Sequence, residues 1–208
     1  FEAHAGEWDA IRSLHIAESE VEAAMVRALG IRSGGEAASL GRLVDIGTGT
    51  GRMIELFGGH ARSALGVDRS PEMLRLARAK LAEAGLAHAE LRQGDMYALA
   101  LPQGSADTVL LHQVLHYAQQ PAAAIGEAGR LLTEGGRLLI VDFAPHERED
   151  LRSRDAHARL GFADDQIAGW LEAAGLALDH VEELGGELTV KLWLGRRRPQ
   201  PHLKAVAA

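Results

Sequence analysis

The sequence contains no cysteine, and this absence excludes several kinds of site at once. Disulfides, thiolate zinc sites, iron–sulfur clusters and cysteine nucleophiles all need a residue that the chain lacks, and we expect no metal site. Long apolar runs are also missing, since none approaches the roughly 20 residues that span a bilayer. The N-terminus lacks the basic and then apolar pattern of a secretory signal. We therefore expect a cytoplasmic protein that does not enter a membrane.

Positive charge is scarce as well. The 22 Lys and Arg residues stand against 29 Asp and Glu, which gives a formal net charge of −7. Because a nucleic-acid-binding surface needs a basic footprint, we expect no direct binding of nucleic acid by this domain. The 208 residues suit one globular domain with one core. The chain begins with Phe1 rather than methionine, which predicts a piece cut from a longer protein.

Helical and strand-like patterns alternate along most of the chain. The first thirty residues carry apolar positions at helical spacing and predict an N-terminal helical cap, followed by a linker rich in small residues. Later apolar runs predict strands over 43–46, 64–68, 89–93, 108–111 and 137–143, separated by helices over 53–57, 70–85 and 121–132. This alternation predicts an α/β fold with a parallel sheet that is covered on both faces.

The C-terminal third predicts an antiparallel edge. After a helix over 164–174, strands over 176–184 and 187–194 are joined at Gly185–Gly186, close enough to pair as a hairpin. We therefore divide the chain into a cap and linker (1–41), a ligand-binding domain (42–195) and a tail (196–208) that we expect to be disordered.

A glycine-rich turn follows the first predicted strand. Residues 45–51 read DIGTGTG, between a buried strand and a helix, where glycines let a ligand lie against bare backbone. The spacing is G-x-G-x-G, whereas a dinucleotide site normally has G-x-G-x-x-G, which disfavours an NAD-dependent oxidoreductase. Taken alone, the turn has a second interpretation, in which it merely packs the helix on the strand.

Acidic residues end the next two predicted strands. Asp68 lies 21 residues after Gly47, where a carboxylate can accept both hydroxyls of an adenosine ribose. Gly94, Asp95 and Met96 follow the third strand, where Asp95 can accept from an adenine amino group and Met96 can pack on the ring. Each residue taken singly could be a cap or a turn residue, but in this order they predict a nucleoside site.

Five segments resemble the successive motifs of class I S-adenosylmethionine-dependent methyltransferases: VDIGTGTG, GVDRSPEML, RQGDMYALALP, HQVLHY and LLTEGGRLLIVDF. The match covers about 43–194. The resemblance implies a Rossmann-like fold, with a seven-stranded, mostly parallel sheet of order 3-2-1-4-5-7-6 and strand 7 antiparallel. It also implies S-adenosylmethionine as cofactor and S-adenosylhomocysteine as product.

The resemblance assigns roles to individual residues. Near the methionine part it places Asp45, which orients the amino group, with Gly47, Thr48, Gly49, Gly51 and His112. Around the nucleoside it places Asp68 on the ribose, with Arg69 beside it, and Met73, Gly94, Asp95 and Met96 at the adenine.

The flanking segments resemble a narrower group. FEAHAGEWDAIR, HQVLHY and VDFAPHERED with RDAHARLGF are similar to the methyltransferase domain that follows a winged-helix DNA-binding domain in certain bacterial arsenic-repressor-type (ArsR-like) regulators. In this interpretation His4, Trp8 and Arg12 form a lid, with the Trp8 ring beside the sulfonium. The alternative for Trp8 is a core anchor of the N-terminal helices. The resemblance implies no arsenic chemistry, because arsenite methylation depends on the missing thiolates.

Four histidines are candidates for the acceptor side. His112 and His116 are four residues apart, which on a helix could suit a metal, but they follow strand four and favour lining of the cofactor or substrate pocket. His146 and His157, with Asp142 and Tyr117, could complete a polar substrate pocket, although surface exposure is the alternative for His157. We name His116 and His146 as candidate general bases, because an imidazole titrates near neutral pH.

Two functions from different classes remain open. The first is an enzyme that methylates a small molecule by in-line transfer. The second is a domain that senses S-adenosylmethionine or S-adenosylhomocysteine for a fused DNA-binding domain, with little turnover. Both functions use the same cofactor residues, so the motifs do not separate them. A homodimer is compatible with either function.

Overall fold

The computed structural model describes residues 17–32, 39–86, 88–149, 151 and 157–199. The strands are β1 (Arg42–Ile46), β2 (Ser63–Asp68), β3 (Glu90–Gln93), β4 (Ala106–His112), β5 (Leu132–Phe143), β6 (Leu176–Leu184) and β7 (Val190–Arg197). The α-helices are α2 (Glu18–Ala28), α3 (Arg52–Phe57), α4 (Pro71–Glu83), α5 (Pro121–Leu131) and α7 (Asp164–Ala173), and two short 3-10 helices are η2 (Gly58–His60) and η3 (Leu115–Tyr117). The predicted lid with His4, Trp8 and Arg12 lies outside the described residues.

The seven strands form one sheet of order β3-β2-β1-β4-β5-β7-β6. Strands β1 to β5 run parallel, and β7 runs antiparallel to both of its neighbours, β5 and β6. The strand order and the antiparallel edge that we expected are therefore confirmed. In a sheet of this kind the carboxyl ends of β1, β2 and β4 meet along one edge, where ligands bind.

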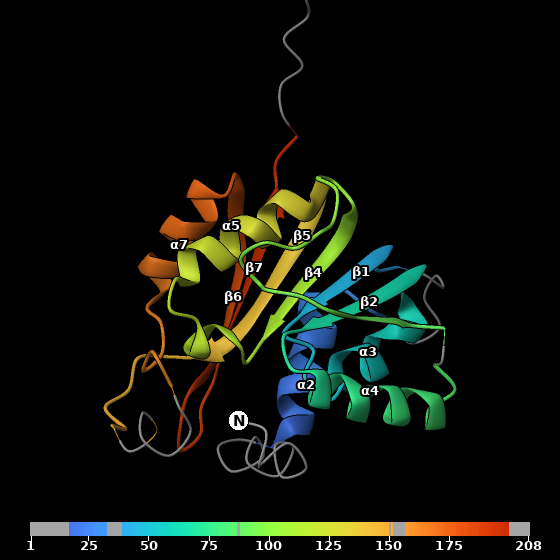
Figure 1. The fold of residues 1–208 in the computed structure, drawn as a ribbon. Helices are drawn as coiled ribbons and strands as arrows, with labels where there is room; N and C mark the ends of the chain where they lie inside the picture. Colours follow the sequence, from blue (N-terminus) through green and yellow to red (C-terminus); the bar gives the residue numbers. More distant parts are fainter. Residues whose placement is uncertain (1–16, 33–38, 87, 150, 152–156, 200–208) are drawn as a thin grey trace, which may run out of the picture.

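Helices cover both faces of the sheet. In Figure 1, α2, α3 and α4 lie on one side of the strands and α5 and α7 on the other. Successive residues of a central strand feed the two cores in turn: Leu110 of β4 packs in the core of α2 and α3, whereas Val109 and Leu111 pack in the core of α5 and α7. This explains why the predicted strands are apolar along their whole length. None of the described helices has the length and apolarity needed to cross a bilayer.

The start of α4 follows the predicted chemistry. Ser70 is the N-cap residue, its hydroxyl accepts a hydrogen bond from the Met73 backbone N–H at 3.3 Å, and Pro71 occupies the first helical position. The Ser–Pro pair therefore ends the loop after β2 and begins the helix where the sequence indicated.

The C-terminal hairpin extends further than expected. β7 starts at Val190 and continues to Arg197, two residues into the segment that we expected as a tail. The added residues pair on both sides, Arg196 with Arg137 of β5 and Arg197 with Leu176 of β6. Neighbouring strands on both sides thus supply ladder partners that the local sequence could not reveal. β5 also begins earlier than expected, at Leu132, and its register with β4 shifts before Arg137.

Candidate functional site

A hollow opens where β1 and β4 end. It is lined by Asp45, Gly47, Thr48, Gly49, Arg52, Met53, His112 and Gln113. Five of these residues were predicted for the cofactor from sequence, and Arg52, Met53 and Gln113 were not. Asp45 is only 1% exposed at the end of β1, so its carboxylate belongs to the interior side of the site.

The three glycines of the loop lack a side chain for different structural reasons. A Cβ on Gly47 would collide with Val114, and a Cβ on Gly51 would lie 3.1 Å from the Ala77 Cβ of α4. Gly47 therefore permits close packing against the turn after β4, and Gly51 permits packing of α3 on α4. Gly49 has φ +53, and a Cβ on it would meet nothing within 4 Å in the described structure. Only Gly49 presents bare backbone to open space, so the packing interpretation explains two glycines and leaves the third for a ligand.

Asp68 ties the glycine loop to the next turn. One carboxylate oxygen accepts from the Gly49 N–H at 2.8 Å, and the other accepts from the Ser70 N–H at 2.8 Å. Both bonds hold the carboxylate at the end of β2 with its remaining lone pairs available. The sequence predicted the carboxylate at this position but not its bond to Gly49.

The residues predicted for the adenine lie at the ends of β2 and β3 and do not line the hollow. Asp95 is exposed, and its carboxylate accepts from the Tyr97 N–H at 3.1 Å. Met96 is half-buried against the core of α5, and Met73 is 5% exposed in the first turn of α4. Gly94 donates its N–H to the Asp68 carbonyl at 3.0 Å, while Arg69 beside it is exposed.

Arg52 is a cation in the first turn of α3, where the helix dipole favours anions. Glu22 of α2 accepts from its Nε at 2.6 Å, and Glu55 accepts from its Nη1 at 2.9 Å. The two carboxylates hold the guanidinium at the rim of the hollow and connect it to α2. A basic residue directly after a glycine loop was the sequence signal that could have identified it.

Gln113 has a strained backbone. It has φ +48, and it is the only non-glycine residue with positive φ among those described. Its N–H donates to the Val141 carbonyl of β5 at 2.7 Å, which helps to hold it in place. Strain of this kind tends to persist at functional sites. No sequence pattern identifies the position.

His116 and Asp142 form a buried pair next to the hollow. Nδ1 of His116 lies 2.8 Å from an Asp142 carboxylate oxygen, and the two side chains are 3% and 0% exposed. Asp142 also accepts from the backbone N–H groups of Leu115, His116 and Phe143. His116 follows two residues after Val114, the residue that packs on Gly47. The turn after β4, in which His116 lies, therefore packs against the glycine loop through Val114.

The other predicted acceptor-side residues surround this pair. The His157 ring centroid lies 4.2 Å from that of His116, and the Tyr117 centroid lies 4.0 Å from it. His157 is 7% exposed, so the surface alternative for it is wrong. His146 is half-buried, with Nδ1 accepting from the Arg148 N–H at 3.2 Å. His112 ends β4 and His116 lies in η3, so these two do not share a helix face as the metal alternative required.

Comparisons with known proteins find similarity to methyltransferases. Residues 44–140 match the family model described as a methyltransferase domain. The uncharacterized methyltransferase YcgJ of Bacillus subtilis is 31% identical over 107 residues, covering 51% of this chain and 42% of that protein. Phosphatidylethanolamine N-methyltransferase of Cereibacter sphaeroides is 34% identical over 112 residues, covering 53% of this chain and 55% of that protein. The chain thus spans about half the length of these relatives.

The fold agrees as well. The crystal structure of a SAM-dependent methyltransferase from Aquifex aeolicus aligns with a TM-score of 0.72 and 18% sequence identity, covering 95% of this chain and 98% of that one. At this identity the likeness shows the fold alone. Together with the strand order, it confirms the Rossmann-like class I arrangement.

Proposed function

We propose that this chain, whose residues 44–140 match a methyltransferase domain family model and whose sheet has the class I order, binds S-adenosylmethionine and methylates a small molecule. The observation that carries the proposal is the hollow at the ends of β1 and β4, where Asp45 and Arg52 flank a glycine loop. The net charge of −7 argues against a nucleic-acid acceptor.

The residues that line the hollow fit the methionine end of the cofactor, and residues at the ends of β2 and β3 fit the nucleoside end. The methionine end carries an ammonium and a carboxylate, for which Asp45 and Arg52 supply opposite charges. Gly49 offers open space to it. Asp68 retains acceptor capacity for ribose hydroxyls, and the exposed Asp95 is available to an adenine amino group.

When bound, S-adenosylmethionine supplies an activated methyl group and leaves as a neutral thioether. The residues of the chain then have mainly to hold and orient both reactants, so proximity and orientation supply much of the rate. A proton acceptor is needed only where the nucleophile of the acceptor carries a proton at neutral pH.

We assign the proton-accepting role to His116. The Asp142 carboxylate accepts hydrogen bonds from three backbone N–H groups, so it also accepts from the Nδ1–H of His116. In this tautomer the neutral imidazole keeps its lone pair on Nε2. His146 is less suited, because its Nδ1 lone pair is already used by Arg148 and its Nε2 carries the proton in the neutral form.

The first experiment is calorimetric titration of the chain with S-adenosylmethionine and S-adenosylhomocysteine, paired with a methyl-release assay. Catechol, ethanolamine and 2-mercaptoethanol serve as oxygen, nitrogen and sulfur acceptors. We expect micromolar binding of both nucleosides and turnover with at least one acceptor class. No binding of either nucleoside to the folded chain would overturn the proposal.

His116→Gln separates the base from the binding site. We expect S-adenosylhomocysteine affinity within about threefold of wild type and a loss of roughly 100-fold or more in transfer to catechol, the scale typical of a general base. Unchanged transfer to catechol in a folded variant that still binds S-adenosylhomocysteine would exclude His116 as the base.

The second candidate function is a sensor of S-adenosylmethionine or S-adenosylhomocysteine attached to a winged-helix domain. This candidate is supported by the resemblance of the flanking segments to ArsR-like regulators. The names of the two relatives described for this chain, which are methyltransferases, do not add to that support. A sensor would bind S-adenosylhomocysteine at least as tightly as S-adenosylmethionine and release no methyl group to any acceptor. Turnover in the assay above decides between the two.

A further inference from the structure

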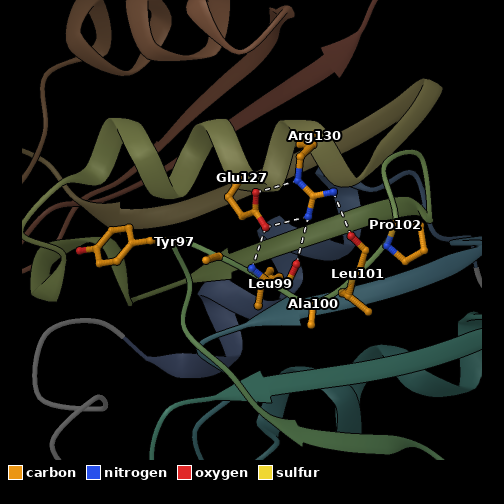
Figure 2. Close-up of a pocket in the computed structure, with 8 residues that line it drawn as sticks. Tyr97, Leu99, Ala100, Leu101, Pro102, Glu127 and Arg130 are labelled. Carbon is orange, nitrogen blue, oxygen red and sulfur yellow. Dashed lines mark hydrogen bonds and ion pairs between the residues drawn. The ribbon is translucent and has the colours of Figure 1, made fainter.

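Two side chains of α5 hold the segment between β3 and β4. We call residues 97–102 of this segment the strap. The Leu99 N–H donates to a Glu127 carboxylate oxygen at 2.7 Å, and Arg130 donates to the carbonyls of Leu99 and Leu101 at 3.2 and 2.9 Å. Figure 2 shows the guanidinium and the carboxylate side by side over the strap. The strap is therefore attached to α5 through the backbone N–H and carbonyl of Leu99 and the carbonyl of Leu101.

Glu127 and Arg130 also bind each other. Arg130 Nε and Nη2 donate to the two Glu127 oxygens at 2.8 and 2.7 Å, a bidentate arrangement. The hydrogen bond from Arg130 lowers the pKa of Glu127, so the pair stays charged near neutral pH. Four of the guanidinium N–H groups are thus used within the chain. Glu127, Arg130 and the strap also line a second, open depression, distinct from the hollow at the ends of β1 and β4. The two charges in it are paired with each other, so we assign its polar groups to holding the strap and not to a ligand.

The strap in turn supports the residues predicted for the adenine. The Leu99 side chain is 6% exposed, and its Cδ2 would lie 3.5 Å from a Cβ on Gly94. Asp95 closes a tight turn, in which its carbonyl accepts from Ala98 and its carboxylate accepts from Tyr97, both at 3.1 Å. Gly94 is bonded to Asp68 of β2. The Asp95 turn is therefore held by β2 at one end and by α5, through Leu99, at the other.

We infer that Glu127 and Arg130 are positioning residues that set the selectivity of this site for adenine, by fixing the strap that directly follows the Asp95 turn. The inference rests on the proposed function. Asp95 itself is exposed, and among the described residues its hydrogen bonds lie within its own turn, so its direction depends on where Leu99 is held. Without the pair, the turn keeps its internal bonds and the hydrogen bond that Tyr97 Oη accepts from the Gln120 N–H at the start of α5. The Leu99 backbone, however, loses its attachment to α5.

The test compares two ligands that differ at the base. S-adenosylhomocysteine carries an amino group at the purine 6-position, and S-inosylhomocysteine carries a carbonyl oxygen that a carboxylate cannot accept from. Calorimetry gives the ratio of their affinities for wild type, Glu127→Ala, Glu127→Gln and Arg130→Ala. Glu182→Ala is the matched control, since it removes a Glu–Arg pair between α2 and β6, away from the strap.

We expect wild type and Glu182→Ala to prefer S-adenosylhomocysteine by at least tenfold. Glu127→Ala and Arg130→Ala should reduce this preference to less than threefold, mainly by weakening S-adenosylhomocysteine. Glu127→Gln should retain most of it, because an amide oxygen still accepts from the Leu99 N–H. A purely structural pair would lower both affinities together and leave their ratio unchanged.

The outcomes separate the two proposals. If wild type binds neither ligand, the proposed function is wrong. If wild type binds S-adenosylhomocysteine but the ratio is the same in Glu127→Ala, or if wild type shows no preference, only the positioning role is wrong. Thermal unfolding of each variant confirms that the measured protein is folded.

Discussion

The backbone N–H of Gly49 donates to the Asp68 carboxylate at 2.8 Å, across 19 residues of sequence. This bond joins the loop after β1, predicted to approach the methionine part of the cofactor, to the carboxylate at the end of β2 that is predicted for the ribose. Each Asp68 oxygen accepts one backbone hydrogen bond, from Gly49 or from Ser70, and retains a lone pair for a further donor. Asp68 therefore shapes the loop and is available to the ribose at once.

Asp68→Ala should weaken S-adenosylhomocysteine binding by at least tenfold. The variant removes charge-assisted hydrogen bonds worth about 1.5 to 3 kcal/mol each, of which one holds the glycine loop and the others go to the ribose. Calorimetry measures the affinity, and circular dichroism checks the fold. Wild-type affinity in a folded variant would place the ribose elsewhere.

Gly49→Ala should abolish or strongly reduce binding with a modest loss of stability. The new Cβ would enter the open space at the loop, and its positive φ costs roughly 1 kcal/mol. Gly85→Ala is the control. Gly85 also has a positive φ (+74), and a Cβ on it would also meet nothing within 4 Å, but it follows the C-terminal end of α4, away from the loop. Both variants should lose similar stability, and only the first should lose affinity. Equal affinities would mean that the ligand does not approach Gly49.

Gln113→Gly should be more stable than Gln113→Ala by about 1 kcal/mol. Both variants lose the side chain, but only glycine adopts φ +48 without strain. Urea unfolding gives the difference, and S-adenosylhomocysteine titration of both variants shows what the side chain contributes. If alanine proves as stable as glycine, the backbone at this position is relaxed.

Asp107→Asn should lower stability near neutral pH without affecting the cofactor site. Asp107 lies at the amino end of β4 and accepts from the Arg42 side chain and backbone and from Thr133. The Arg42 hydrogen bond holds the pKa of Asp107 well below its usual range. Because the folded-state pKa is depressed, the stabilisation is complete above the unfolded pKa near 3.9 and is lost as the pH falls toward the folded-state pKa.

The side chain is one-third exposed, so we expect a cost of only about 1 to 2 kcal/mol at pH 7. The difference between wild type and variant should shrink between about pH 5 and pH 2. Urea unfolding across this range measures it. A difference that is independent of pH would contradict the linkage, and a change in S-adenosylhomocysteine affinity would contradict the separation of the two ends of the sheet.

Much of the fold could be predicted because its signals are local. The apolar runs of the central strands, the Ser70–Pro71 start of α4 and the glycines at 47, 49 and 51 each depend on neighbouring residues. The same holds for the positions of Asp45 and Asp68, which end strands and therefore had to reach the ligand-binding edge. The resemblance then supplied the strand order, which periodicity alone does not encode.

The sequence by itself determined where strands, helices and the glycine loop lie and which side chains end each strand, because spacing and turn chemistry act over a few residues. Only the tertiary structure decided which of these side chains meet. The Asp142–His116 contact joins residues 26 apart, and the Arg130–Leu99 contact joins residues 31 apart. The pairing of Arg52 with Glu22 and the positive φ of Gln113 likewise depend on how α2 and β5 pack around them. Such contacts arise from the register of the sheet and the packing of helices on it, which no short stretch of the chain specifies.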